Sequence, residues 1–268
     1  MAAQMLIYDT ATPVSYGRHG NWSIEVGTDF SFSRGLNSVP LMSVEILPAA
    51  VEYPLVFGGT GDIVMPAAIL GVRADENLYL TETGGWQAQY IPAFLRRYPF
   101  VFSSSDEGKT FTLCIDETFP GFNQKGRGER LFTDERNPTP YVENVLKFLQ
   151  QYQHEFRRTQ AFCRKLKDVN VLEPMQAQIN LDSGERIALT GFSAVDRARL
   201  KTLTADVLVD LTKSDELELI YAHLFSMRNF SGMKDRLAKA PASPKAEPGL
   251  VAEGTTGKEE SVPEGGSA

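Results

Sequence analysis

Two adjacent arginines beside aromatic residues offer the clearest binding chemistry in this chain. Arg96 and Arg97 lie in IPAFLRRYPFVF (91–102), with Trp86 before them and Tyr98 directly after. A guanidinium binds a carboxylate or phosphate through two parallel hydrogen bonds, and it also stacks on aromatic rings. We therefore predict that Trp86, Arg96, Arg97 and Tyr98 form a site for a small anionic ligand. The alternative is an exposed arginine beside one held in an internal salt bridge, because neighbouring helical positions point about 100° apart.

The arginine-bearing segment repeats an earlier one. LPAAVEYPLVF (47–57) shares with it an aliphatic–Pro–Ala start and a Tyr–Pro–apolar–Val–Phe end, and it carries Glu52 in the middle. Proline suits the first helical position and biases the preceding residue toward extended geometry. We expect Pro48–Tyr53 and Pro92–Tyr98 each to form a short helical turn that leads into a strand. Because the sequences that follow differ, a reused local structure is favoured over a duplicated domain.

Metal, cofactor and nucleotide sites are not indicated by the other motifs. The histidines, His19, His154 and His223, are isolated in the sequence, so none forms a cluster with metal-ligand spacing. SSSDEGKT (103–110) ends like a phosphate-binding loop, but it begins with Ser103 and a strand-like run follows it. We predict no metal and no cofactor.

Composition restricts the possible partners and compartments. The chain has 268 residues, a net charge of −7 and an isoelectric point near 5.1, which argues against general nucleic-acid binding. No run of 18 apolar residues occurs, so no transmembrane segment is predicted. The first residues resemble no secretory signal, and we expect a cytoplasmic protein. Cys114 and Cys163 are predicted to be buried free thiols.

Hydrophobic periodicity predicts an α+β fold in one domain, 1–239. Residues 1–135 are β-rich, and 136–239 combine helices with a hairpin. The last stretch, 240–268, carries two Lys and five Glu among Pro, Gly and Ser, and we expect it to be a disordered acidic tail. The expected elements are hairpins over 77–91, 100–116 and 175–195, a buried strand within 64–72, a long helix from 140 to 167, and helices after Asp196, after Thr204 and over 215–227.

The last of these helices is strongly apolar and could dock a protein partner. Leu217, Ile220, Tyr221 and Leu224 are its candidate contact residues. His223 lies in the same run, where a hydrogen-bonded core or interface histidine is expected.

Four blocks of sequence together resemble the bacterial SapC family. They are YIPAFLRRYPFVF, LFTDERNPTPYVENVLKFLQQYQHEFRRTQAFCRKL, LTGFSAVD and LELIYAHLFSM, within residues 5–229. The resemblance implies a link to bacterial surface (S-) layers. Relatives are also often encoded near TonB-dependent receptors, tryptophan-halogenase-like flavoproteins and cupin-type iron oxygenases. It implies no set of catalytic residues.

Two functions follow as hypotheses. The first is a cytoplasmic accessory protein that binds a partner and is not catalytic. The second is an enzyme that acts on a peptide or small anion, with a site assembled from distant loops. Its residues would be the four predicted ligand-binding residues, with His19 and Asp116 added. The oligomeric state stays open.

Overall fold

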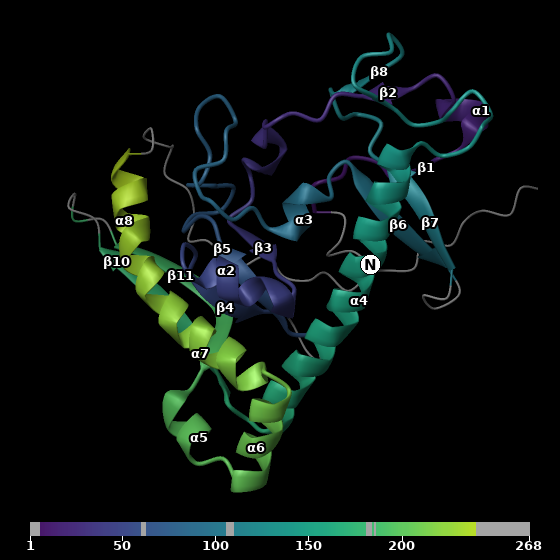
Figure 1. Ribbon diagram of the computed structural model, residues 1–268. Helices are drawn as coiled ribbons and strands as arrows, with labels where there is room; N and C mark the ends of the chain where they lie inside the picture. Colours follow the sequence, from purple (N-terminus) through teal and green to yellow (C-terminus); the bar gives the residue numbers. More distant parts are fainter. Residues whose placement is uncertain (1–5, 60–62, 106–109, 181–183, 185, 240–268) are drawn as a thin grey trace, which may run out of the picture.

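The computed structural model describes residues 6–59, 63–105, 110–180, 184 and 186–239. Within them, helices and several antiparallel sheets follow one another along the chain, so the predicted α+β class is confirmed. In Figure 1 the long helix α4 (Pro140–Asp168) and the consecutive helices α7 (Glu216–Ser226) and α8 (Phe230–Lys239) form two arms of a V. The arms converge near α5 (Arg197–Lys201) and α6 (Ala205–Lys213). The centre of the largest sheet lies between the arms, and one edge of the sheet packs against the arm formed by α7 and α8.

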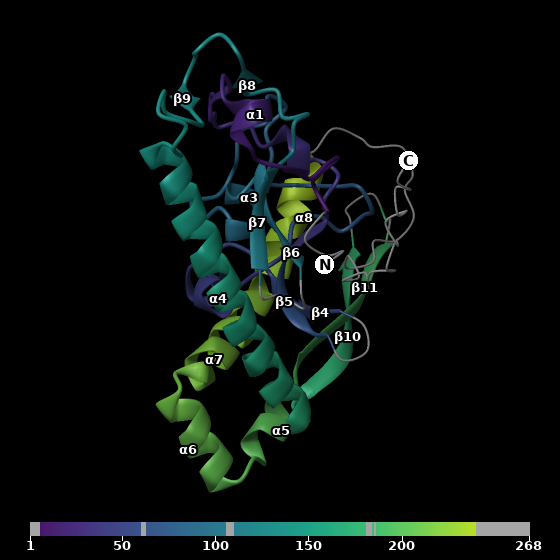
Figure 2. The ribbon, with the colours of Figure 1, turned by 90° about the vertical axis from the view of Figure 1, so that its right-hand side faces the viewer.

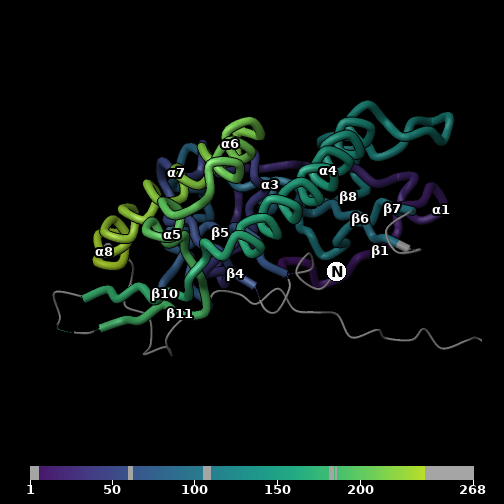
Figure 3. Tube along the Cα trace, turned by 90° about the horizontal axis from the view of Figure 1, so that it is seen from below, coloured from purple at the N-terminus to yellow at the C-terminus, as the bar shows by residue number. Residues whose placement is uncertain are grey.

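The largest sheet has five strands in the order β10–β11–β4–β5–β3, and all neighbours are antiparallel. Its strands are β3 (Ser38–Pro40), β4 (Leu55–Gly58), β5 (Met65–Ile69), β10 (Leu172–Asn180) and β11 (Arg186–Val195). Figure 3 shows β10 and β11 side by side along one edge of the molecule. Because β11 pairs with β4 near the sheet centre, the C-terminal hairpin and the N-terminal strands form one sheet.

Two smaller sheets lie near the start of α4, at the top of Figure 2 and just below it. One has the order β1–β7–β6 and the other β8–β2–β9. Their strands are β1 (Thr12–Pro13), β2 (Ser23–Ile24), β6 (Phe100–Ser105), β7 (Thr110–Ile115), β8 (Phe122–Asn123) and β9 (Glu129–Arg130). The short helices are α1 (Tyr16–His19), α2 (Ile46–Ala50), α3 (Ala93–Arg96) and 3-10 turns at Ser31–Ser33, Ser43–Glu45 and Met227–Asn229.

Helix α4 joins two hydrophobic cores. Thr139 caps it by accepting a hydrogen bond from the Val142 amide, and Pro140 occupies the first turn. Val142 and Leu149 pack with aromatic residues of the small sheets, whereas Phe162 and Leu166 pack in the main core. The apolar spacing of three and four residues therefore serves two different neighbours along one helix.

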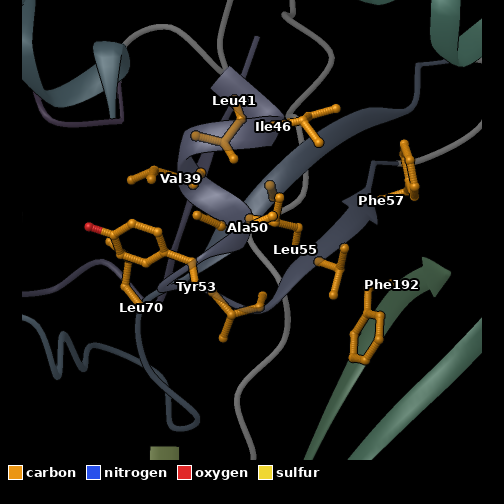
Figure 4. Close-up of a cluster of buried hydrophobic side chains, with 14 of the residues drawn as sticks. Val39, Leu41, Ile46, Ala50, Tyr53, Leu55, Phe57, Leu70 and Phe192 are labelled. Carbon is orange, nitrogen blue, oxygen red and sulfur yellow. The ribbon is translucent and has the colours of Figure 1, made fainter. Parts of the chain in front are cut away.

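The main core is formed by residues of α2, of the central strands β4 and β5, and of the elements packed against them. Figure 4 shows side chains of this core that come from β3, α2, β4 and β11, among them Val39, Ile46, Leu55 and Phe192. The central strands carry runs of apolar residues rather than an alternating pattern, because helices and loops cover both of their faces.

A histidine side chain completes the join between β11 and β4. Direct pairing is limited to Phe192 with Gly58 and Ser193 with Phe57. The same register would place Val195 opposite Leu55, but the imidazole of His223 from α7 lies between them. The Val195 amide donates to Nε2 (3.1 Å), and Nδ1 donates to the Leu55 carbonyl (2.9 Å). Since Nε2 accepts a bond, the ring is the neutral Nδ1–H tautomer.

Ser226, one turn after His223, serves the same strand. Its hydroxyl accepts from the Leu55 amide (3.0 Å) and donates to the His223 carbonyl (2.6 Å). Both backbone groups of Leu55 are thus bonded to side chains of α7. The expectation of a hydrogen-bonded core histidine is confirmed, because His223 is 1% exposed.

The sequence predictions of elements hold at most places. The hairpins over 100–116 and 175–195 are confirmed by their paired strands, β6 with β7 and β10 with β11. Part of each turn lies outside the described residues. The hairpin over 77–91 is only partly formed. Among the described residues it turns back on itself through an isolated antiparallel bridge between Leu80 and Trp86, with backbone hydrogen bonds from Thr81 to Gly85 and from Gln87 to Tyr79, but no strands extend from this bridge, and side chains hold the rest of the segment. Helix α8 was not predicted.

Candidate functional site

Arg97 is buried among aromatic rings. Its side chain comes from the end of α3, and the residue is 2% exposed. The guanidinium carbon lies 4.4 Å from the ring centre of Phe94, 4.9 Å from Tyr152 and 5.6 Å from Tyr8. Cations attract the faces of aromatic rings more strongly where water is excluded. Arg97 thus ties α3 to α4 and to the N-terminal segment.

The phenols around Arg97 stay protonated. Burial raises the pKa of Tyr152 to about 12, and it raises the pKa of Tyr8 further still. The Tyr8 hydroxyl donates to the Phe100 carbonyl at 2.7 Å. At neutral pH these residues therefore present neutral ring faces to the arginine.

Arg96 and Trp86 have different surroundings from Arg97. Arg96 is exposed, its Nε donates to the Ile91 carbonyl (2.9 Å), and its guanidinium lies over Phe148 at 5.4 Å. The Trp86 indole donates to the Tyr53 hydroxyl at 2.9 Å. The two predicted residues thus lie with different partners, Trp86 in the loop before α3 and Arg96 against α4.

Tyr98 shares a neighbour with Arg97. Its ring stacks on Phe32 (4.3 Å between centres) and meets the edge of Tyr8 at 5.3 Å. The structure therefore brings Tyr98 and Arg97 together through the Tyr8 ring, and it places Trp86 and Arg96 elsewhere. The predicted anion site remains a prediction.

Two carboxylates, Glu45 just before the first Pro–Ala segment and Glu52 within it, hold the chain at the start of the second segment. Glu45, 3% exposed, accepts from the amides of Met42 (2.8 Å) and Ala93 (2.7 Å) and from the Tyr90 hydroxyl (2.7 Å). Burial raises the pKa of Glu45, and these donors oppose the rise. Glu52 accepts from the amides of Gln89 and Tyr90. The charge of Glu52 therefore has a structural partner, whereas Glu45 was missed because no motif marks it.

Asp116 and His19 lie in hydrogen-bond networks of the small sheets. Asp116 is fully buried and accepts from the Asp9 amide (2.8 Å), and from the amide (3.1 Å) and hydroxyl (2.8 Å) of Thr118. His19 is also fully buried; its Nδ1 accepts from the Ser15 amide and its Nε2 donates to Glu117 at 2.8 Å. Arg18 binds both oxygens of that carboxylate. Both nitrogens of His19 are thus engaged within the protein.

An apolar groove lies between α2 and α7, which pack side by side (Figure 1). We call it the α2–α7 groove. Its volume is about 550 Å³. The lining residues are Leu47, Ala50, Val51, Arg197, Glu218, Tyr221, Ala222, Leu224 and Phe225. Val51 is 67% exposed, Phe225 53% and Tyr221 48%, so large apolar side chains face solvent here.

The groove includes half of the predicted partner-binding residues. Tyr221 and Leu224 line it. Ile220 is fully buried in the main core, and Leu217 packs against that core. The α2 side was missed, although Val44, Leu47 and Val51 are spaced by three and four residues, the spacing that places side chains on one helical face.

Both cysteine thiols lie in the protein interior. Cys114 and Cys163 are free and buried, as predicted, and burial raises the pKa of Cys163 to about 12. Across the part of the chain that the structure describes, no three His, Cys, Asp or Glu side chains gather closely enough to hold a metal ion. Within the same residues, every helix is too short or too polar to cross a membrane.

The buried His223 predicts a pH dependence of stability. Burial lowers its pKa from 6.5 to about 4, against the opposing bond to the Leu55 carbonyl. Below pH 6.5 the unfolded chain binds a proton that the folded chain does not, so the free energy of unfolding falls as pH drops from 6.5 to 4. The expected loss from this one group is about 3 kcal/mol. Urea unfolding at pH 7, 6, 5 and 4.5 measures it.

A His223→Gln variant isolates this contribution from those of other titrating groups. The difference in unfolding free energy between wild type and variant is expected to shrink as pH falls from 6.5 to 4.5. A difference that stays constant over this range would contradict the lowered pKa.

The comparisons with known proteins give one match. Residues 14–233 match the SapC family. Neither the curated proteins nor the solved structures contain a chain that matches. The matched region begins near β1 and ends within α8, so it includes Arg97 with two of its three aromatic neighbours, the His223 join and both sides of the α2–α7 groove. On this match over most of its length, the chain belongs to the SapC family.

Proposed function

We propose that this chain is a non-catalytic accessory protein that binds a partner protein through the α2–α7 groove. The observation that carries the proposal is the exposure of Val51, Tyr221 and Phe225 around one apolar depression. Apolar side chains exposed together mark interaction surfaces, because single exposed apolar residues are common but clustered ones are not.

The partner that fits is an amphipathic helix with acidic flanks. The groove runs between two helical segments, and a helix with apolar residues at every third and fourth position packs into such a groove. Arg197 lines the groove, and Arg228 is exposed with its guanidinium 4.4 Å from the Phe225 ring centre. These cations favour acidic groups beside the apolar face of the partner, whereas Glu218 disfavours them locally.

Family membership supports a bacterial setting for this proposal. We propose that the protein acts in the cytoplasm, in connection with the surface-layer or TonB-receptor gene products with which the family is associated. The two free thiols are compatible with a reducing compartment.

Replacing Phe225 with aspartate is expected to weaken partner binding at least 30-fold. A buried aromatic anchor contributes about 2 kcal/mol or more to binding, and a charge in its place also has to be desolvated. Phe225 is exposed in the free chain, so the variant is expected to keep its unfolding free energy within about 0.5 kcal/mol. Val209→Asp, at an exposed apolar residue outside the groove lining, is the matched control.

The measurement begins with a photoreactive amino acid in place of Tyr221 in the full chain, expressed in a bacterium that carries the family's neighbouring genes. A discrete adduct is expected, and Phe225→Asp but not Val209→Asp should abolish it. The adduct partner is identified by mass spectrometry, and its affinity is then measured by calorimetry for all three chains. An adduct of twice the chain mass, or one insensitive to Phe225→Asp, overturns the proposal.

A further inference from the structure

We propose that the α2–α7 groove is regulated by the chain's own C-terminal segment, with Leu250 and Val251 as the apolar residues that occupy it. This inference rests on the proposed function, because it assumes that the groove is a binding site. It adds that the free protein covers the site itself, so that a partner has to displace the segment.

The chemistry of the groove fits a small apolar occupant with acidic flanks. Leu47, Val51 and Phe225 provide an exposed apolar floor and walls. Arg197 and Arg228 are exposed, and neither takes part in an ion pair with another described residue. An apolar stretch bordered by carboxylates would bury the apolar surface and neutralise the two guanidinium groups.

The sequence beyond Lys239 contains one stretch of this kind. In EPGLVAE (247–253), Leu250, Val251 and Ala252 are flanked by Glu247 and Glu253. Elsewhere in 240–268 no two large aliphatic residues are adjacent, and the whole stretch carries a net charge of −3. Composition thus singles out one segment with the apolar core and acidic borders that the groove requires.

The segment is long enough to reach the groove. Leu250 lies eleven residues beyond Lys239, which allows a span of up to about 36 Å. Tyr221 precedes Lys239 by eighteen residues of α7, a 3-10 turn and α8, which separates them by about 27 Å if the path is straight. The reach therefore exceeds the distance to be covered.

Covalent attachment makes even weak binding effective. A short flexible linker gives an effective concentration in the millimolar range. A segment that binds with a Kd of about 0.1 mM as a free peptide would then occupy most of the grooves, and it would lower the apparent affinity of a partner about 10-fold.

The test compares full-length chains by methyl NMR. Leu250→Asp with Val251→Asp is expected to shift the methyl signals of Leu47, Val51 and Leu224, because it releases the segment. Val262→Asp, at the isolated aliphatic residue of the same tail, is the matched control and should leave them unchanged. A peptide of residues 244–256, added to the double variant, should restore the wild-type shifts, and its Leu250→Asp form should not.

Two further observations distinguish an intramolecular segment from a second copy of the chain, and failure of this inference from failure of the proposed function. The shifts are expected to be independent of protein concentration between 20 and 500 μM; concentration dependence means that a second copy is bound and overturns the inference. Unchanged methyl signals in the double variant also overturn it, but they leave the proposed function intact if the Phe225-dependent adduct is present. Loss of that adduct's dependence on Phe225 refutes the proposed function itself.

Discussion

His223→Ala is expected to lower the free energy of unfolding by about 3–5 kcal/mol. The imidazole accepts from the Val195 amide and donates to the Leu55 carbonyl, and alanine would leave both buried groups without these bonds. Each unsatisfied buried group costs about 1–3 kcal/mol, and the removed ring leaves a cavity against Phe57. Urea unfolding followed by circular dichroism at pH 7.5 measures the change.

His154→Ala is the matched control for this experiment. His154 is exposed on α4, so its removal is expected to change the unfolding free energy by less than about 0.5 kcal/mol. His223→Asn should fall between wild type and His223→Ala, because an amide can also donate and accept but is shorter than imidazole. Equal losses in His223→Ala and His154→Ala would show that the imidazole does not hold the two strands together.

Glu45→Ala is expected to destabilise the protein by a similar amount, about 3–5 kcal/mol. Its carboxylate receives three hydrogen bonds, from Met42, Tyr90 and Ala93, at a site that is almost completely buried. Removing the acceptor leaves three donors to be satisfied by water in a site closed by packing. Thermal and urea unfolding of the variant measure the loss.

Glu52→Ala, in the Pro–Ala segment that follows Glu45, provides the comparison. Glu52 also accepts backbone amides, from Gln89 and Tyr90, but it is only partly buried. Water can replace its carboxylate, so the expected loss is about 1 kcal/mol. If Glu52→Ala costs as much as Glu45→Ala, burial is not what sets the energy of this network.

The two Pro–Ala segments show what a short pattern can and cannot predict. Each forms a short helix that leads into a strand, α2 into β4 and α3 into β6, as predicted. The role of proline differs, however. Helix α2 begins two residues before Pro48, whereas α3 begins directly after Pro92. The strands also enter different sheets, so the shared letters encode a local turn and not a shared position in the fold.

Elements that depend on nearby residues could be predicted from the sequence, whereas elements that depend on residues far away in the chain could not. The 29-residue helix α4 and the strands of two hairpins were predicted, because periodicity and capping residues act over a few positions. The segment before α3 reads as a hairpin, yet Glu52, from another part of the chain, binds its amides. Helix α8 is short and mostly polar, and Met233 and Leu237 anchor it in a core assembled from distant strands.

The candidate site follows the same rule. The sequence identified Tyr221 and Leu224, since α7 is rich in large apolar residues. It could not identify Val51 as their neighbour, because that pairing depends on how α2 packs against α7. Likewise, adjacency in sequence suggested a shared role for Arg96 and Arg97, but one is exposed and the other lies among three rings.

The His223 join also constrains the order in which the protein assembles. Leu55 and His223 are 168 residues apart, and Val195 precedes His223 by 28. A ribosome therefore synthesises both strands before it makes the imidazole that links them. Until α7 is synthesised and docks, the Leu55 carbonyl and the Val195 amide lack their native partner, and the centre of the largest sheet closes only when the last quarter of the domain arrives.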